Sequence, residues 1–199
     1  PRSRGLGDVY KRQINMKYKV FDYTSLITEK DRKNICKDVK ASINEGKYYT
    51  NSPRYQTNFE VFTLPGIHWL KLRMSFYSAC FFYLEKEAQI SKVQSWSYMT
   101  SLEYPEDRKN LWHNHDHKRE RKLLSGIFYA YIPEDVDDFK KAGTEFAPNG
   151  VGKKKRTWIE PCIGKWAIYD SYYWHRPGVL QSFDNRFIVA ADMEYVIPQ

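Results

Sequence analysis

The chain has 199 residues, a formal net charge of +8 and an aromatic content of 17%. These values exclude a disordered chain and are typical of a globular, β-rich protein with one sizeable core. No apolar run approaches the ~18 residues that a membrane-spanning helix needs. Cys36, Cys80 and Cys162 are too widely spaced for a zinc motif or a disulfide framework, so a cytoplasmic location without membrane contact is expected.

The first residues differ from the rest of the chain. Pro1 to Gln13 has no apolar periodicity and no signal-peptide core, and it resembles translated adaptor sequence. We therefore leave it out of the fold prediction, take Met16 as the expected start and predict a single domain over residues 14–199.

The N-terminal third of the sequence predicts two helices. Thr28 to Asp31 resembles a capping box with Asp in place of Glu, apolar residues follow at four-residue steps, and the first helix is expected to end at Gly46. Residues 47–67 are typical of a loop or a short irregular strand. The second helix is predicted from Ile67 to Glu87. Its expected core stripe consists of Trp69, Leu72, Phe76, Cys80 and Tyr83.

From residue 92 onward the period changes, and short runs rich in aromatic and β-branched residues predict strands. The predicted strands are Val93–Leu102, Leu123–Ile132, Gly143–Ala147, Thr157–Glu160, Lys165–Asp170 and Arg186–Val196. Two helices packed against a sheet that folds back on itself would bury both helical stripes. The expected fold is therefore mostly β with N-terminal helices: a double-stranded β-helix (jelly roll) with the helices packed on one sheet.

Positive charge gathers in two short runs, Lys118–Lys122 and Lys153–Arg156. Both flank predicted strands, so they are expected to be solvated hairpin tips, or alternatively a means of attracting an anionic substrate. Nucleic-acid binding would require a continuous basic face with interleaved aromatic residues, which the sequence does not indicate.

Three of the five histidines in the chain fall within a single short stretch, at His113, His115 and His117, with Asp116 among them. Imidazole and carboxylate together suit divalent iron, zinc, copper and nickel. In an extended segment His113 and His115 point to the same face and can bind one ion. A solvated polar loop is the alternative. His68 stands apart at the start of the second helix and is expected to be structural or exposed.

A second group of candidate residues lies near the C-terminus. His175 is expected at the end of the Lys165–Asp170 strand. Arg186 comes eleven residues later and begins the last apolar strand. An arginine whose strand neighbours are all apolar tends to point into the barrel, where its guanidinium group requires a carboxylate partner. That partner is either a bound molecule or a protein carboxylate in a buried structural ion pair.

The order and spacing of these motifs resemble the iron(II)- and 2-oxoglutarate-dependent dioxygenases, specifically the prolyl-hydroxylase-like group of marine microbes and viruses. The resemblance covers about Val93 to Val196. It is carried by Gln94-Ser95-Trp96, His113 and His115, Leu124 to Tyr129, Gly143 to Phe146, and His175 with Arg186. It implies a double-stranded β-helix, iron(II) held by an early strand and a late histidine, and Arg186 bound to the distal carboxylate of the cosubstrate 2-oxoglutarate.

One position departs from the pattern of that family. The usual motif is His-x-Asp, whereas this chain has histidine at 115 and aspartate at 116. A regular strand makes His113, His115 and His175 the metal ligands, which is the prediction preferred here. A bulge would turn Asp116 inward in place of His115. His117, nearer the loop, is the least favoured ligand of the cluster.

The resemblance implies hydroxylation of an unidentified small-molecule or peptidyl substrate. By strand alternation, Tyr98 and Tyr129 are expected to face the same cavity, where they either bind the cosubstrate or belong to the core. Two other functions stay open. A three-histidine cupin-type metalloenzyme would keep the histidines without using 2-oxoglutarate or Arg186. A non-catalytic jelly-roll binding module would need neither the three histidines nor Arg186. The sequence does not indicate an oligomeric state.

Overall fold

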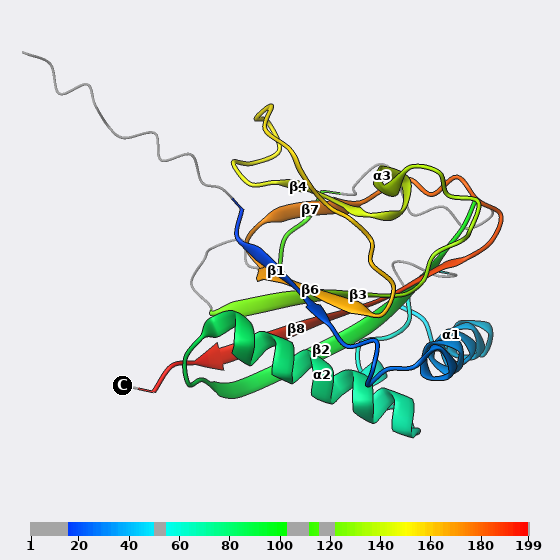
Figure 1. Cartoon of the computed structure of the whole chain (residues 1–199), viewed down its shortest axis with the longest axis horizontal. Helices are drawn as coiled ribbons and strands as arrows, with labels where there is room; N and C mark the ends of the chain where they lie inside the picture. Colours follow the sequence, from blue (N-terminus) through cyan, green and yellow to red (C-terminus); the bar gives the residue numbers. More distant parts are fainter. Residues whose placement is uncertain (1–15, 50–54, 103–111, 116–121, 199) are drawn as a thin grey trace, which may run out of the picture.

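The structure is a computed structural model that describes residues 16–49, 55–102, 112–115 and 122–198. Its elements, in chain order, are β1 (Tyr18–Asp22), α1 (Glu29–Asn44), the 3-10 turn η1 (Val61–Thr63), α2 (Ile67–Leu84), β2 (Gln89–Thr100), β3 (Leu123–Tyr131), α3 (Phe139–Ala142), β4 (Thr144–Ala147), β5 (Thr157–Ile159), β6 (Lys165–Asp170), β7 (Trp174–Pro177) and β8 (Arg186–Val196) (Figure 1).

The strands form two antiparallel sheets. The major sheet has the order β1-β6-β3-β8-β2, and the minor sheet has the order β5-β4-β7. The minor sheet lies over one face of the major sheet, while α1 and α2 lie over the other (Figure 1). The expected mostly-β architecture with N-terminal helices on one sheet is therefore present.

Side-chain alternation along β8 separates the interior into two layers. Val189 and Met193 belong to the large cluster beneath the helices, which also contains the α2 stripe. Ile188 belongs to a second cluster between the two sheets, together with Tyr129 and Tyr169. Because successive strand residues point to opposite faces, each strand contributes to both layers. The layer between the sheets is the one that contains the candidate site.

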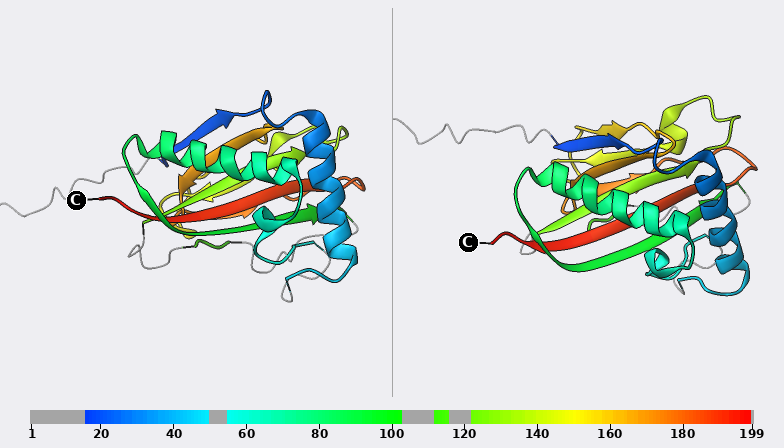
Figure 2. Two further views of the ribbon diagram at one scale, coloured as in Figure 1. Left: turned by 90° about the horizontal axis from the view of Figure 1, so that it is seen from below. Right: turned by 60° about the horizontal axis from the view of Figure 1, so that its bottom comes forward.

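The predicted capping box starts α1. The backbone N–H of Asp31 donates to Thr28 Oγ1 at 3.3 Å, and the Thr28 N–H donates to Asp31 Oδ2 at 2.9 Å. Lys71 of α2 also binds this carboxylate, at 2.9 Å. Gly46, at φ +78°, follows the last turn as expected. Both ends of the helix therefore follow from local chemistry, and α1 lies across the N-terminal end of α2 (Figure 2).

We expect Thr28→Ala to lower the free energy of unfolding by about 0.5–2 kcal/mol, because the first turn loses a side-chain acceptor. Urea denaturation of the two proteins measures the difference. Lys30→Ala, on the exposed surface of the same turn, is the control and should change stability by less than ~0.5 kcal/mol. Equal stability of wild type and Thr28→Ala would show that the cap contributes nothing.

The predicted α2 stripe is buried, from Trp69 at 0% exposed to Tyr83 at 4%. The predicted helix end at Glu87 is wrong: α2 ends at Leu84, because Glu85 adopts a left-handed conformation with φ +56°. The chain then turns, and β2 starts at Gln89, earlier than predicted. There its polar first residues pair with the end of β8. Among the described residues, no helix is long and apolar enough to cross a membrane.

Two strands, β1 and β7, were not predicted from the sequence. β1 pairs with β6 at the edge of the major sheet. β7 lies in the minor sheet, so the expectation that His175 ends the Lys165–Asp170 strand is wrong. A turn after Asp170, with the Tyr173 N–H bound to the Asp170 carbonyl at 3.2 Å, ends β6 and starts a new strand in the other sheet. β7 has only four residues, too few to show a period.

Candidate metal centre

Two segments far apart in sequence bring the histidines together. The His113 N–H donates to the His175 carbonyl at 3.1 Å, and the His175 N–H donates to the His113 carbonyl at 2.9 Å. This antiparallel pair places the two side chains on the same face. Two residues further on, the His115 N–H donates to the Ser171 carbonyl at 3.0 Å. Backbone hydrogen bonds therefore hold His113 beside β7 and His115 beside the turn that precedes β7.

The three imidazole rings converge. One nitrogen of each of His113, His115 and His175 lies within 4.8 Å of the others. The ring centroids are 4.3 Å apart for His113 and His175, 5.0 Å for His115 and His175, and 5.3 Å for His113 and His115. Three imidazoles at this spacing form a donor set that suits a divalent transition metal.

Hydrogen bonds fix the tautomer of two of these rings. His175 Nδ1 is 2.9 Å from the Tyr173 carbonyl oxygen, and His115 Nδ1 is 2.8 Å from Asp192 Oδ2. Both partners are acceptors, so Nδ1 of each ring is the donor and Nε2 is the atom that would bind a metal. Burial, reinforced by His113 and His115, lowers the pKa of His175 well below its ordinary value. His175 is therefore held in the neutral form that binds metals.

Aromatic residues enclose the histidines. The rings of Trp96 and His115 are T-shaped with centroids 5.5 Å apart, and the ring centroids of Phe146 and Tyr169 lie 5.5 and 5.4 Å from that of His175. Trp96 is 5% exposed, and its indole Nε1 has no hydrogen-bond partner among the described residues. An unmatched buried donor is costly. The Trp96 indole thus places an unmatched buried N–H in a side chain that contacts His115.

Arg186 is fully buried on the same inner layer. Its Nη1 donates to the carbonyls of Ala142 and Gly178 at 2.9 and 3.3 Å, and its Nε donates to Thr100 Oγ1 at 3.2 Å. Thr100 and Arg186 are also opposite each other in the pairing of β2 with β8. These bonds fix the direction of the guanidinium group.

The two candidate tyrosines also face the inner layer. Tyr129 and Tyr98 both pair with Ile188, from either side of β8. The Tyr129 hydroxyl is 3.0 Å from Thr144 Oγ1, and burial raises the pKa of Tyr129 to about 12, so it stays a neutral donor. Thr144 lies two residues along β4 from Phe146, which is roughly 7 Å of strand. Tyr129 and Thr144 are thus displaced along the strands from His175, toward the end where the Gly178 carbonyl accepts from Arg186.

The remaining histidine candidates have other positions. His68 Nε2 is 2.7 Å from Asp38 Oδ2, and the Trp69 indole donates to the same oxygen at 2.9 Å. His68 is therefore a buried structural residue that joins α2 to α1. Asp116 and His117 lie outside the described residues.

Trp112 and Arg176, the sequence neighbours of His113 and His175, lie on the opposite face of their strands from these histidines. Arg176 binds the buried Glu145 at 2.6 Å, and Arg156 lies 3.5 Å from the same carboxylate. Both guanidinium groups lie over the ring of Trp112, at 4.5 and 5.0 Å. Since Trp112 and Arg176 adjoin His113 and His175 in extended segments, they occupy the outer face of the minor sheet. Arg156, from the second basic run, thus packs against the sheet, whereas Lys153 and Lys154 of the same run are exposed between β4 and β5, as expected for a solvated tip.

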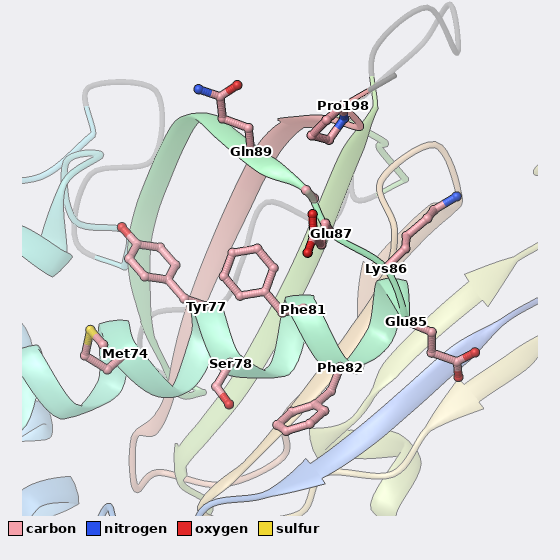
Figure 3. Close-up of a pocket in the computed structure, with 11 residues that line it drawn as sticks. Met74, Tyr77, Ser78, Phe81, Phe82, Glu85, Lys86, Glu87, Gln89 and Pro198 are labelled. Carbon is pink, nitrogen blue, oxygen red and sulfur yellow. The ribbon is translucent and has the colours of Figure 1, made fainter.

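An open groove lies elsewhere, on the helix side of the major sheet (Figure 3). It is lined by residues of α2, including Met74, Tyr77, Phe81 and Phe82, by the segment 85–89 that leads into β2, and by Pro198. The major sheet separates it from the histidines, so it takes no part in the candidate centre.

Sequence reasoning missed two residues of this centre. In the sequence, Trp96 stands out only within the Gln94-Ser95-Trp96 motif, and Asp192 lies in a strand that is otherwise largely apolar. Asp192 could have been found by period, because it shares the strand face of Arg186 and lies six residues after it.

Comparisons with known proteins show which fold this is. No family model matches the sequence, and no curated protein is similar to it in sequence. A Pseudomonas putida prolyl-4-hydroxylase superposes with a TM-score of 0.60 at 11% identity, over 90% of this chain and 93% of that one. A Trichoplax adhaerens prolyl hydroxylase, in complex with a hypoxia-inducible-factor peptide fragment, gives 0.60 at 11% identity, over 89% and 83%. HygX from Streptomyces hygroscopicus, with nickel and 2-oxoglutarate bound, gives 0.61 at 7%, over 90% and 82%. The chain therefore shares the fold of iron- and 2-oxoglutarate-dependent oxygenases and has three convergent histidines between its sheets.

Proposed function

We propose that the protein is an iron(II)- and 2-oxoglutarate-dependent dioxygenase with a double-stranded β-helix fold. The observation that carries this proposal is the convergence of His113, His115 and His175 on the layer between the sheets, with Arg186 buried in the same layer. The three imidazoles would hold iron(II). When bound, iron and 2-oxoglutarate would supply the oxidation with O2 as the oxidant: one oxygen atom would enter succinate as 2-oxoglutarate loses CO2, and the other would become the hydroxyl group of the substrate.

The protein's own residues bind and orient the cosubstrate. Arg186 would bind its distal carboxylate through a charge-assisted contact, with the guanidinium group already directed by Thr100 and two carbonyls. Tyr129 would donate a hydrogen bond to the same molecule, and Tyr98 lies across β8 from it. Trp96 would donate to a ligand atom beside His115. The aromatic residues around the histidines exclude water from the reacting group.

A peptidyl residue or a small molecule is the substrate class we propose. The Trichoplax structure holds a peptide, while HygX has 2-oxoglutarate and a nickel ion bound. The test is succinate release by the iron-loaded protein against a panel of peptides, amino acids, sugars and nucleobases. Succinate formation that requires 2-oxoglutarate, iron and one panel member supports the proposal.

A three-histidine cupin-type enzyme that does not use 2-oxoglutarate is the second candidate. The histidine at position 115, where the resembled family has a carboxylate, favours it. Such an enzyme would bind iron but show no 2-oxoglutarate binding. A non-catalytic binding module would bind neither iron nor 2-oxoglutarate. Titrations with iron and then with 2-oxoglutarate therefore distinguish the three functions.

We expect His115→Ala to weaken iron binding more than Asp116→Ala does. The His115 ring is stacked against His113, with 21° between the ring planes, so the two share a face. Anaerobic iron(II) titration of both variants gives the ranking. A larger loss in Asp116→Ala would make the carboxylate the ligand and would indicate a bulged strand.

A further inference from the structure

A carboxylate lies directly behind one of the three histidines. Asp192 Oδ2 is 2.8 Å from His115 Nδ1, and the Ser125 hydroxyl donates to Asp192 Oδ1 at 2.6 Å. Asp192 and Ser125 are opposite each other in the pairing of β8 with β3, and Asp192 is 8% exposed. Two central strands of the major sheet therefore hold this carboxylate against the imidazole.

We propose that Asp192 is a positioning residue that orients His115 as a metal ligand. It also provides the negative charge that an aspartate at position 115 would have supplied. The inference rests on the proposed metal centre. Histidines that bind metals usually donate their second N–H to a carboxylate or a carbonyl, which fixes the ring and makes it a stronger ligand. Asp192 does this for His115, as the Tyr173 carbonyl does for His175.

The charge of the site gives Asp192 a second role. Three neutral imidazoles leave both positive charges of a divalent ion uncompensated, whereas a His-x-Asp motif neutralises one of them. In this chain the compensating charge is the carboxylate of Asp192 on β8, which is separated from the proposed ion by the imidazole ring of His115. Coulomb attraction at that distance in a largely buried site still favours the bound cation. β8 thus presents Asp192 beside the proposed metal and Arg186 further along the same strand face.

Two other roles for Asp192 make different predictions. It could be a ligand itself, but the convergent donor atoms come from the three histidines and do not include Asp192. It could also be merely a buried acceptor for Ser125, whose hydroxyl lies 2.8 Å from that of Ser171. In that case its loss would lower stability and leave metal affinity unchanged.

A double-mutant cycle with Co(II) separates these roles. The metal-free protein, Asp192→Asn, His115→Ala and the double variant are titrated anaerobically with Co(II), following its visible absorption, and thermal unfolding of each is measured. We expect one Co(II) per wild-type chain and a dissociation constant raised roughly 10- to 100-fold in Asp192→Asn. In the His115→Ala background, Asp192→Asn should have no further effect, because it acts through the missing ring.

Asp38→Asn is the matched control, since Asp38 binds His68 at 2.7 Å away from the centre. It should lower thermal stability and leave Co(II) affinity unchanged. If Asp192→Asn does not fold, Asp192→Ser provides the same comparison. Wild-type affinity in the Asp192 variant would overturn the inference, as would an equal loss in the His115→Ala background, which would make Asp192 a ligand. Absence of Co(II) binding by the wild type would instead remove the proposed metal centre, and this inference with it.

Discussion

His175→Ala is expected to abolish iron(II) binding. His175 is 5% exposed, its backbone pairs with His113, and its Nδ1 is bound to the Tyr173 carbonyl. Its Nε2, which lies 3.4 Å from the Tyr169 hydroxyl, is therefore the atom that would bind the metal. Removing one of three ligands should cost more than the roughly 10- to 100-fold that losing an outer partner costs. Iron per chain is measured after anaerobic loading and desalting, alongside the Kd from titration.

His68→Ala is the matched control for this experiment. His68 is also buried and also hydrogen-bonded, but to Asp38 on the helix side of the major sheet. Its loss should lower the melting temperature and leave one iron per chain. Full iron stoichiometry in His175→Ala, at a melting temperature that shows a folded protein, would remove this histidine from the centre.

Arg186→Leu is expected to weaken 2-oxoglutarate binding roughly tenfold to hundredfold while iron content stays intact. The contact at stake is a charge-assisted hydrogen bond, worth about 1.5–3 kcal/mol, and leucine fills part of the space without leaving a buried charge. Arg186 also donates to two backbone carbonyls, so some loss of stability is expected as well. Binding of 2-oxoglutarate and thermal unfolding are therefore measured on the same sample.

Arg176→Leu is the control, because Arg176 adjoins His175 but binds Glu145 on the outer face of the minor sheet. Its loss should reduce stability and leave 2-oxoglutarate affinity unchanged. If Arg186→Leu destabilises the fold with no change in 2-oxoglutarate affinity, Arg186 is structural, and the three-histidine cupin-type enzyme becomes the better proposal.

Local chemistry in the sequence determined the helices and most strands. The α1 cap depends on two residues three positions apart, and the α2 stripe depends on apolar residues that recur with the period of the helix. Both could therefore be predicted without knowing the fold. The aromatic, β-branched runs likewise located β3, β6 and β8. The set of residues with metal-binding chemistry was also evident, because imidazoles are rare in this chain and three of them are close together.

Only the tertiary structure decided how these residues meet. β7 is too short to show a period, and its pairing with the His113 segment joins residues about sixty apart in sequence, so register and not composition brings His175 to His113. The same pairing turns Trp112 and Arg176 outward to Glu145. The partnership of Asp192 with His115 depends on the register of β3 with β8, a contact across seventy-seven residues. The sequence by itself determined which side chains could bind a metal and a carboxylate; strand pairing, a non-local property, decided which of them share one layer.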